Sequence, residues 1–79
     1  MEINTAQVRA ARALLDWNQA DLAAAAEISL PTVKRYEAGM RTPIPPILTA
    51  IRRALEDAGV IFENDGKHVG VKLKIRRGK

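Results

Sequence analysis

The sequence predicts a mainly α-helical fold in which four helices are followed by a C-terminal β-hairpin. Up to Gly59, apolar residues recur at helical spacing, in segments separated by capping residues, glycines and prolines. Beyond Gly59 they alternate with polar residues, as in a strand, and the Asp65-Gly66 pair is a strong hairpin signal. We therefore expect a helical domain at 1–59 and a hairpin with a basic tail at 60–79. A chain of 79 residues can bury only one small core.

The first two helices are predicted at 6–15 and 19–26. Thr5 is the expected N-cap of the first helix, because its hydroxyl can accept a hydrogen bond from a free amide of the first turn. Asn18 is the expected N-cap of the second helix, which is short and rich in alanine and so allows close packing. The apolar stripe of the first helix consists of Val8, Ala11 and Leu15.

Two further helices are predicted on either side of a proline-containing loop. Ser29 caps the third helix, Pro31 lies in its first turn, and Gly39 ends it. The fourth helix is expected from about Pro46 to Gly59. Its apolar face consists of Ile47, Leu48, Ile51, Leu55 and Ala58.

The predicted hairpin has one apolar face. A two-residue turn at Asp65-Gly66 would pair Phe62 with Val69 and Val60 with Val71. An isolated hairpin is marginally stable in water, so this face must pack on the helices or against another hairpin. Packing on the chain's own core and dimerisation both satisfy this requirement. Our hypothesis is a dimer interface formed by Val60, Phe62, Val69, Val71 and Leu73.

The net charge of +4 is unevenly distributed. Residues 67–79 hold six basic and no acidic side chains, which leaves seven basic and nine acidic ones in residues 1–66. The basic tail is therefore either a solubilising end or a contact to an anionic partner, with Lys72, Lys74 and Arg76 as candidates for flanking DNA phosphates.

Several classes of protein are disfavoured by composition. Without cysteine the chain has neither disulfides nor thiolate metal sites. The single histidine, His68, lies in a predicted turn and reads as a surface residue. No carboxylate pair or glycine-rich phosphate loop stands out, so we expect no enzyme activity, metal or cofactor. Neither a signal peptide nor an apolar run of about 20 residues is present, and we expect a soluble cytoplasmic protein without a membrane partner.

Two short helices are joined here by a tight turn, and the second of them begins at a polar N-cap residue. This arrangement is typical of a helix-turn-helix, whose second helix can enter the DNA major groove. The segments that carry this pattern are Gln19-Ala20-Asp21-Leu22-Ala23, Ile28-Ser29 and Thr32-Val33-Lys34-Arg35-Tyr36-Glu37-Ala38-Gly39. They resemble the lambda-repressor-like (XRE) family of helix-turn-helix transcriptional regulators over residues 5–58. The resemblance implies a bacterial or phage regulator that binds double-stranded DNA. The chain would most simply be a repressor on an inverted-repeat operator, bound as a homodimer.

The chain departs from the family pattern at two places. Glu27 stands in the turn where relatives often have glycine in a left-handed conformation. A side chain there costs about 1 kcal/mol, so we expect either a slightly different turn or local strain. Leu30 and Pro31 stand where many relatives place polar base readers. Hydrogen-bonded base recognition should therefore depend on fewer residues.

The resemblance implies phosphate contacts at the N-terminus of the second helix and in the loop after the third helix. Gln19, at the N-terminus of the second helix, is expected to anchor a phosphate with its side chain and the free helix amides. Asn18 would either assist it or act only as the cap, which we favour. Arg41, in the loop after the third helix, is expected to meet another phosphate.

The expected base contacts lie on the third helix. Arg35 is the best candidate for a bidentate contact to guanine. Lys34 would touch a base or a phosphate, or remain solvated. Thr32 could reach a base or phosphate, and Leu30 and Pro31 could contact a thymine methyl, although each of these three also has a plain helix-start role.

Other conspicuous side chains have structural interpretations. The resemblance implies an internal salt bridge between Arg12 and Glu37, which would also neutralise an acid near the phosphates. Trp17 and Tyr36 are expected in the core rather than stacked on bases, because the domain has little else of their size.

Two other functions stay open at this point. An antitoxin or antiactivator would use DNA binding only for autoregulation and would have a protein target, with the hairpin as its docking segment. An RNA-binding module is a weaker alternative, because the chain lacks the exposed aromatic platform on which bases stack.

Overall fold

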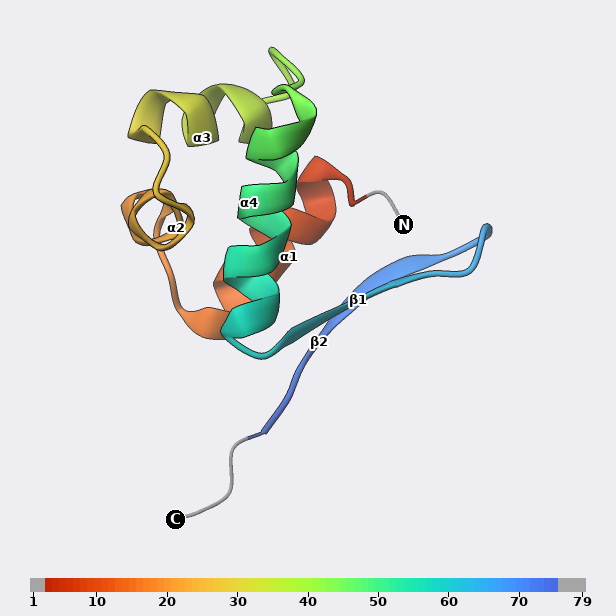
Figure 1. Cartoon of the computed structure of the whole chain (residues 1–79). Coiled ribbons are helices and arrows are strands. Elements are labelled where there is room, and N and C mark those ends of the chain that lie inside the picture. The colour runs from red at the N-terminus through yellow and green to blue at the C-terminus, as the bar shows by residue number, and fades with distance from the viewer. Residues whose placement is uncertain (1–2, 76–79) are drawn as a thin grey trace.

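The structure is a computed structural model that describes residues 3–75. Its order is four helices and then a two-stranded antiparallel hairpin, which confirms the predicted fold class (Figure 1). The elements are α1 (Thr5–Leu15), α2 (Gln19–Ala26), α3 (Leu30–Glu37), α4 (Pro45–Asp57), β1 (Val60–Asn64) and β2 (Val69–Leu73). No helix within residues 3–75 is long and apolar enough to cross a membrane.

Capping side chains set the helix starts. Asn18 and Ser29 cap α2 and α3 as predicted. The prediction for α1 was wrong by one residue, because Asn4 rather than Thr5 is its N-cap. The Asn4 side chain accepts the Gln7 amide at 2.8 Å, and the Gln7 side chain accepts the Asn4 amide at 3.0 Å. This reciprocal pair satisfies two amides, which a threonine cap at position 5 would not do.

The turn between α2 and α3 contains the expected departure from the helix-turn-helix pattern. Glu27 adopts a left-handed conformation with φ of 59° and ψ of 44°. Its amide bonds back to the Ala24 carbonyl at 3.2 Å and the Ile28 amide to the Ala23 carbonyl at 3.0 Å, so the turn keeps its shape without glycine. The Cβ of Glu27 makes this conformation unfavourable.

Glu27→Gly should therefore raise the free energy of unfolding by about 1 kcal/mol, or Tm by about 4–8 °C. The measurement is thermal unfolding followed by circular dichroism. Glu27→Ala is the matched control, since it removes the charge but keeps the Cβ, and it should give no such gain. An equal gain in both variants would attribute the effect to charge instead of backbone strain.

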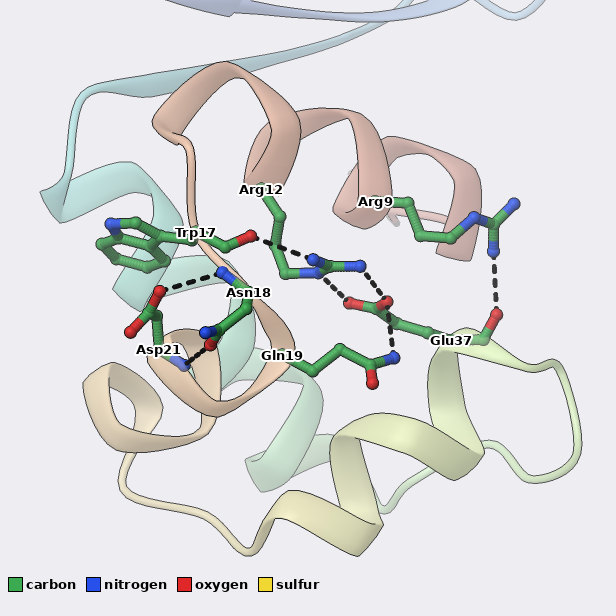
Figure 2. Close-up of polar contacts among 7 residues, drawn as sticks. All are labelled: Arg9, Arg12, Trp17, Asn18, Gln19, Asp21 and Glu37. Carbon is green, nitrogen blue, oxygen red and sulfur yellow. Dashed lines mark hydrogen bonds and ion pairs between the residues drawn. The ribbon is translucent and has the colours of Figure 1, made fainter.

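One core joins the helices to the hairpin. α1 lies between the hairpin on one side and α2 with α3 on the other (Figures 1 and 2). From the hairpin, Val60 and Phe62 enter this core and are only 3% and 7% exposed. The fully buried side chains of the core include Val8, Leu22, Val33, Ile51 and Leu55.

The hairpin register differs from the predicted one by two residues. Phe62 pairs with Val71 rather than Val69, and Val60 pairs with Leu73. A type I′ turn needs positive φ at both central residues, but only Gly66, with φ of 89°, has it; Asp65 does not. Because a shift of two keeps each side chain on its face, the predicted inner face is nevertheless correct.

The carboxylate of Asp65 explains this longer turn. It accepts the amides of Lys67 at 2.9 Å and His68 at 2.6 Å, and its other oxygen lies 3.1 Å from the His68 ring. The Lys67 amide first, and then the His68 side chain and amide, hold the pKa of Asp65 below its ordinary value. The side chain thus organises residues 65–68 as one connection and shifts the strand pairing.

A buried glutamine fastens the hairpin to α1. Gln7 is 3% exposed, and its amide nitrogen donates to the carbonyls of Glu63 and Gly70, each at 3.0 Å. Glu63 and Gly70 are cross-strand partners, so one side chain contacts both strands. Gln7 therefore holds the strands together at the same point where it attaches them to the helical domain.

Candidate nucleic-acid interface

The two sides of α3 differ in their exposure to solvent. Val33 and Tyr36 face the core and are almost fully buried. Pro31, Lys34 and Arg35 are exposed, and their spacing of three and four places them on one stripe of the helix. α3 lies at the periphery of the molecule, at the upper left in Figure 1. A helix with this arrangement can present basic side chains to a groove while its inner side stays anchored.

An ion pair holds the C-terminal end of α3. The Glu37 carboxylate is buried and accepts Arg12 Nε at 2.7 Å and Arg12 Nη2 at 2.6 Å (Figure 2). This is the internal salt bridge that the resemblance implied. Hydrogen bonding to Glu37 raises the pKa of Arg12, so the guanidinium is charged throughout the physiological pH range. The bidentate geometry fixes both distance and orientation between α1 and α3.

The comparison with known proteins agrees with this geometry. The model of the helix-turn-helix family HTH_3 matches residues 8–56, which is more than half of the chain. The chain belongs to this family. No curated protein matches it. As an HTH_3 protein, which is of the XRE or lambda-repressor-like kind, it is a sequence-specific DNA-binding regulator of transcription and not an enzyme.

In this helix-turn-helix regulator, Gln19 occupies a more constrained place than predicted. Its amide nitrogen donates to Glu37 Oε1 at 3.1 Å, so it belongs to the ion-pair network (Figure 2). This contact orients the amide so that one N–H is used internally and the second N–H is left for another acceptor. Gln19 thus links the N-terminus of α2 to the end of α3.

Asn18 serves as the cap that we favoured. Its side-chain oxygen accepts the Asp21 amide at 2.8 Å, and Asp21 Oδ2 accepts the Asn18 amide at 2.9 Å (Figure 2). Among the described residues, neither the amide of Gln19 nor that of Ala20 has a hydrogen-bond acceptor. The first turn of α2 therefore retains two backbone donors at its surface.

The α3–α4 loop adds a second basic group beside α3. Thr32, Arg35, Arg41 and Pro43 line a small pocket of about 70 Å³. The structure thus brings together two arginines that the sequence placed only on separate segments. Thr32 is tied to the cap, since its hydroxyl lies 2.7 Å from the Ser29 hydroxyl, and Leu30 is partly buried against the core.

Three contacts of this interface were not foreseen. Arg9 donates to the Glu37 carbonyl at 2.8 Å, and Arg12 also donates to the Trp17 carbonyl at 3.0 Å (Figure 2). The third is the bond from Gln19 to Glu37. The only available signal was the spacing of Arg9 and Arg12, which puts both on one side of α1. Trp17 packs partly buried against the core and Tyr36 is buried in it, as expected.

The remaining predicted residues lie apart from α3. Val60, Phe62, Val69, Val71 and Leu73 belong to the hairpin, on the other side of α1. Val60 and Phe62 are buried in the chain's own core, which leaves these two side chains little surface for a partner. Val69 is 50% exposed. Lys72 pairs with Glu63 at 2.9 Å, and Arg76 lies outside the described residues.

Proposed function

We propose that this regulator is a repressor that binds an inverted-repeat operator as a homodimer. The observation that carries the proposal is the exposed stripe of α3, in which Lys34 and Arg35 face away from a fully anchored inner side. One such helix reads only a few base pairs, so two copies related by a two-fold axis are needed for a long site. Repression then follows from occupancy of the operator.

The N-terminus of α2 supports a phosphate contact next to this helix. The free amides of Gln19 and Ala20 and the remaining side-chain N–H of Gln19 suit a phosphate oxygen. Since Gln19 is held by Glu37, its donors are oriented before DNA arrives. Such a contact positions α3 and carries no sequence information by itself.

The charges around α3 support the same orientation on DNA. Lys34, Arg35 and Arg41 are exposed, whereas the acid at the end of α3, Glu37, is buried and neutralised by Arg12. The DNA-facing side therefore attracts phosphates even though residues 1–66 as a whole are not basic. Arg35 suits a guanine, and Arg41 suits the adjoining backbone.

Arg35→Ala should weaken binding to the operator by about 10- to 100-fold and relax one base position in each half-site. The measurement is selection of bound DNA fragments at near-physiological salt, followed by titration of the enriched site. Lys67→Ala is the control, because it removes one positive charge from the hairpin tip, on the far side of α1 from α3. It should change affinity less than about twofold.

The selection experiment also tests the proposed function as a whole. Enrichment of an inverted repeat with half-sites about one helical turn apart would support it. A motif without two-fold symmetry would contradict the dimeric operator while leaving DNA reading intact. Absence of any motif would favour the alternative in which a protein partner, and not an operator, is the main target.

A further inference from the structure

The two strands of the hairpin are unequally buried on their inner face. On β1, Val60 and Phe62 are below a tenth exposed. On β2, Val69 is 50% exposed, and Val71 and Leu73 are only partly buried. α1 packs against β2, but it covers the inner face of this strand less completely than the core covers β1, which leaves an apolar margin along β2. The hairpin tip also projects beyond the helices (Figure 1).

The same strand has a free hydrogen-bonding edge. Lys74 donates to the Gly59 carbonyl and Asp65 to the His68 carbonyl, so the hydrogen-bonded pairs between them are Ile61–Lys72 and Glu63–Gly70. The alternate residues of β2 direct their N–H and C=O outward. These residues are Val69, Val71 and Leu73. Within residues 3–75, no hydrogen bond reaches their outward groups.

We propose that the outer edge of β2 pairs antiparallel with β2 of a second copy, with the two-fold axis at Val71. This inference deepens the dimer of the proposed function, on which it rests. The pairing would join the two hairpins into one four-stranded sheet. It would also extend the apolar margin of Val69, Val71 and Leu73 across the axis, where each copy covers the other.

The side chains along β2 favour a two-fold axis at Val71 over an axis at Gly70 or Lys72. With the axis at Val71, Lys72 of one copy lies opposite Gly70 of the other, and Glu63 is the cross-strand neighbour of Gly70. Glu63 pairs with Lys72 of its own chain at 2.9 Å but stays half exposed, and Gly70 has no side chain, so Lys72 of the second copy can approach the same carboxylate. An axis at Lys72 would instead oppose two lysines, which is destabilising. An axis at Gly70 would leave Leu73 without an apolar partner.

The most direct test compares two variants that carry opposite charges at position 70. An added Cβ there meets only Glu63 Oε1 at 3.7 Å, so substitution is tolerated within the protomer. Gly70→Lys would face Lys72 of the second copy, and Gly70→Glu would form an opposite-charge pair with it. We expect Gly70→Lys to dimerise at least about fivefold more weakly than Gly70→Glu, with the difference shrinking in high salt.

A purely intramolecular effect has the opposite sign. Within one protomer Gly70→Lys gains a favourable neighbour in Glu63, and Gly70→Glu gains a repulsive one. Thermal unfolding of the monomer should therefore rank the variants in reverse order to sedimentation equilibrium of the dimer. The same rank in both measurements, or equal dimerisation, would overturn the proposed register.

A second test uses proline substitutions to compare the outer edge of β2 with the outer edge of β1. Val69 and Asn64 are cross-strand partners whose amides both point outward, so proline at either position removes no ladder bond within the hairpin. Val69→Pro should weaken dimerisation at least tenfold, or about 1.4 kcal/mol. Asn64→Pro removes the bond from the Gly66 amide to the Asn64 side chain but leaves the outer edge of β2 intact, so it should leave dimerisation unchanged.

The outcomes separate this inference from the proposed function. A wild-type chain that is monomeric at micromolar concentration, or a dimer lost in Asn64→Pro and kept in Val69→Pro, would overturn the β2 edge. A dimer that neither proline weakens would also overturn the β2 edge. The proposed repressor could then still dimerise through another interface. If Val69→Pro gives monomers but no operator is found, the β2 interface is supported and the proposed function fails.

Discussion

Replacing Arg12 by alanine is expected to lower the free energy of unfolding by about 3–5 kcal/mol. The change leaves the Glu37 carboxylate, whose side chain is 2% exposed, with Gln19 as its remaining side-chain donor in the network. It also removes the donor to the Trp17 carbonyl. Urea denaturation measures the loss, which corresponds to a fall of at least about 12 °C in Tm. For a domain of this size, such a loss removes most of its stability.

Two further variants separate charge from packing. Arg9→Ala removes a single exposed donor to the Glu37 carbonyl and should cost about 1 kcal/mol or less. The double variant Arg12→Met with Glu37→Met removes both charges and keeps apolar volume, so it should recover most of the stability lost in Arg12→Ala. An Arg12→Ala variant as stable as the wild type would contradict a structural role for the Arg12–Glu37 pair. A double variant as unstable as Arg12→Ala would point to packing.

Phe62→Ala is expected to destabilise the domain by about 3–5 kcal/mol, although Phe62 lies outside the helix-turn-helix. The ring is 7% exposed and belongs to the same core as Leu55 and Val8. Its loss leaves a cavity between the hairpin and the helices. The measurement is again urea denaturation, with circular dichroism at 222 nm to follow the helices.

Ile61 supplies the matched control on the same strand. It points to the opposite face and is 47% exposed, so Ile61→Ala should cost about 0.5 kcal/mol. Similar losses in the two variants would mean that the hairpin does not pack as described. The expected contrast also implies that deleting the hairpin unfolds the helical domain, so deletion cannot be used to prepare a monomeric DNA reader.

Local signals were sufficient for most of the helical part. Asn18 and Ser29 mark the starts of α2 and α3 because a capping side chain interacts with amides only two or three residues away. The α1 start was missed by one residue because Asn4 and Thr5 are both good caps. Only the reciprocal contact with Gln7 decides between them. At Glu27 the sequence left a different turn or local strain open, and the left-handed backbone shows that the turn keeps its shape at the cost of strain.

Long-range polar contacts could not be read from the sequence. Gln7 looks like an ordinary helix former, and its role depends on two carbonyls more than fifty residues away. The hairpin register was missed because Asp-Gly favours a type I′ turn, whereas the Asp65 side chain stabilises a different one. In the candidate site, the exposed stripe of α3 followed from spacing. The pocket between Arg35 and Arg41 depends on how the loop folds back.

The position of α1 has a consequence for the DNA that this protein can use. Gln7 fixes the hairpin to one side of α1, while Arg9 and Arg12 fix the end of α3 to the other. In a dimer joined along β2, no flexible linker separates the interface from the reading helices. One inserted base pair between half-sites shifts them by about 3.4 Å and rotates them by about 35°. A rigid protomer of such a dimer cannot absorb that change of helical phase, and the length of the spacer between half-sites would then be part of what the proposed dimer recognises.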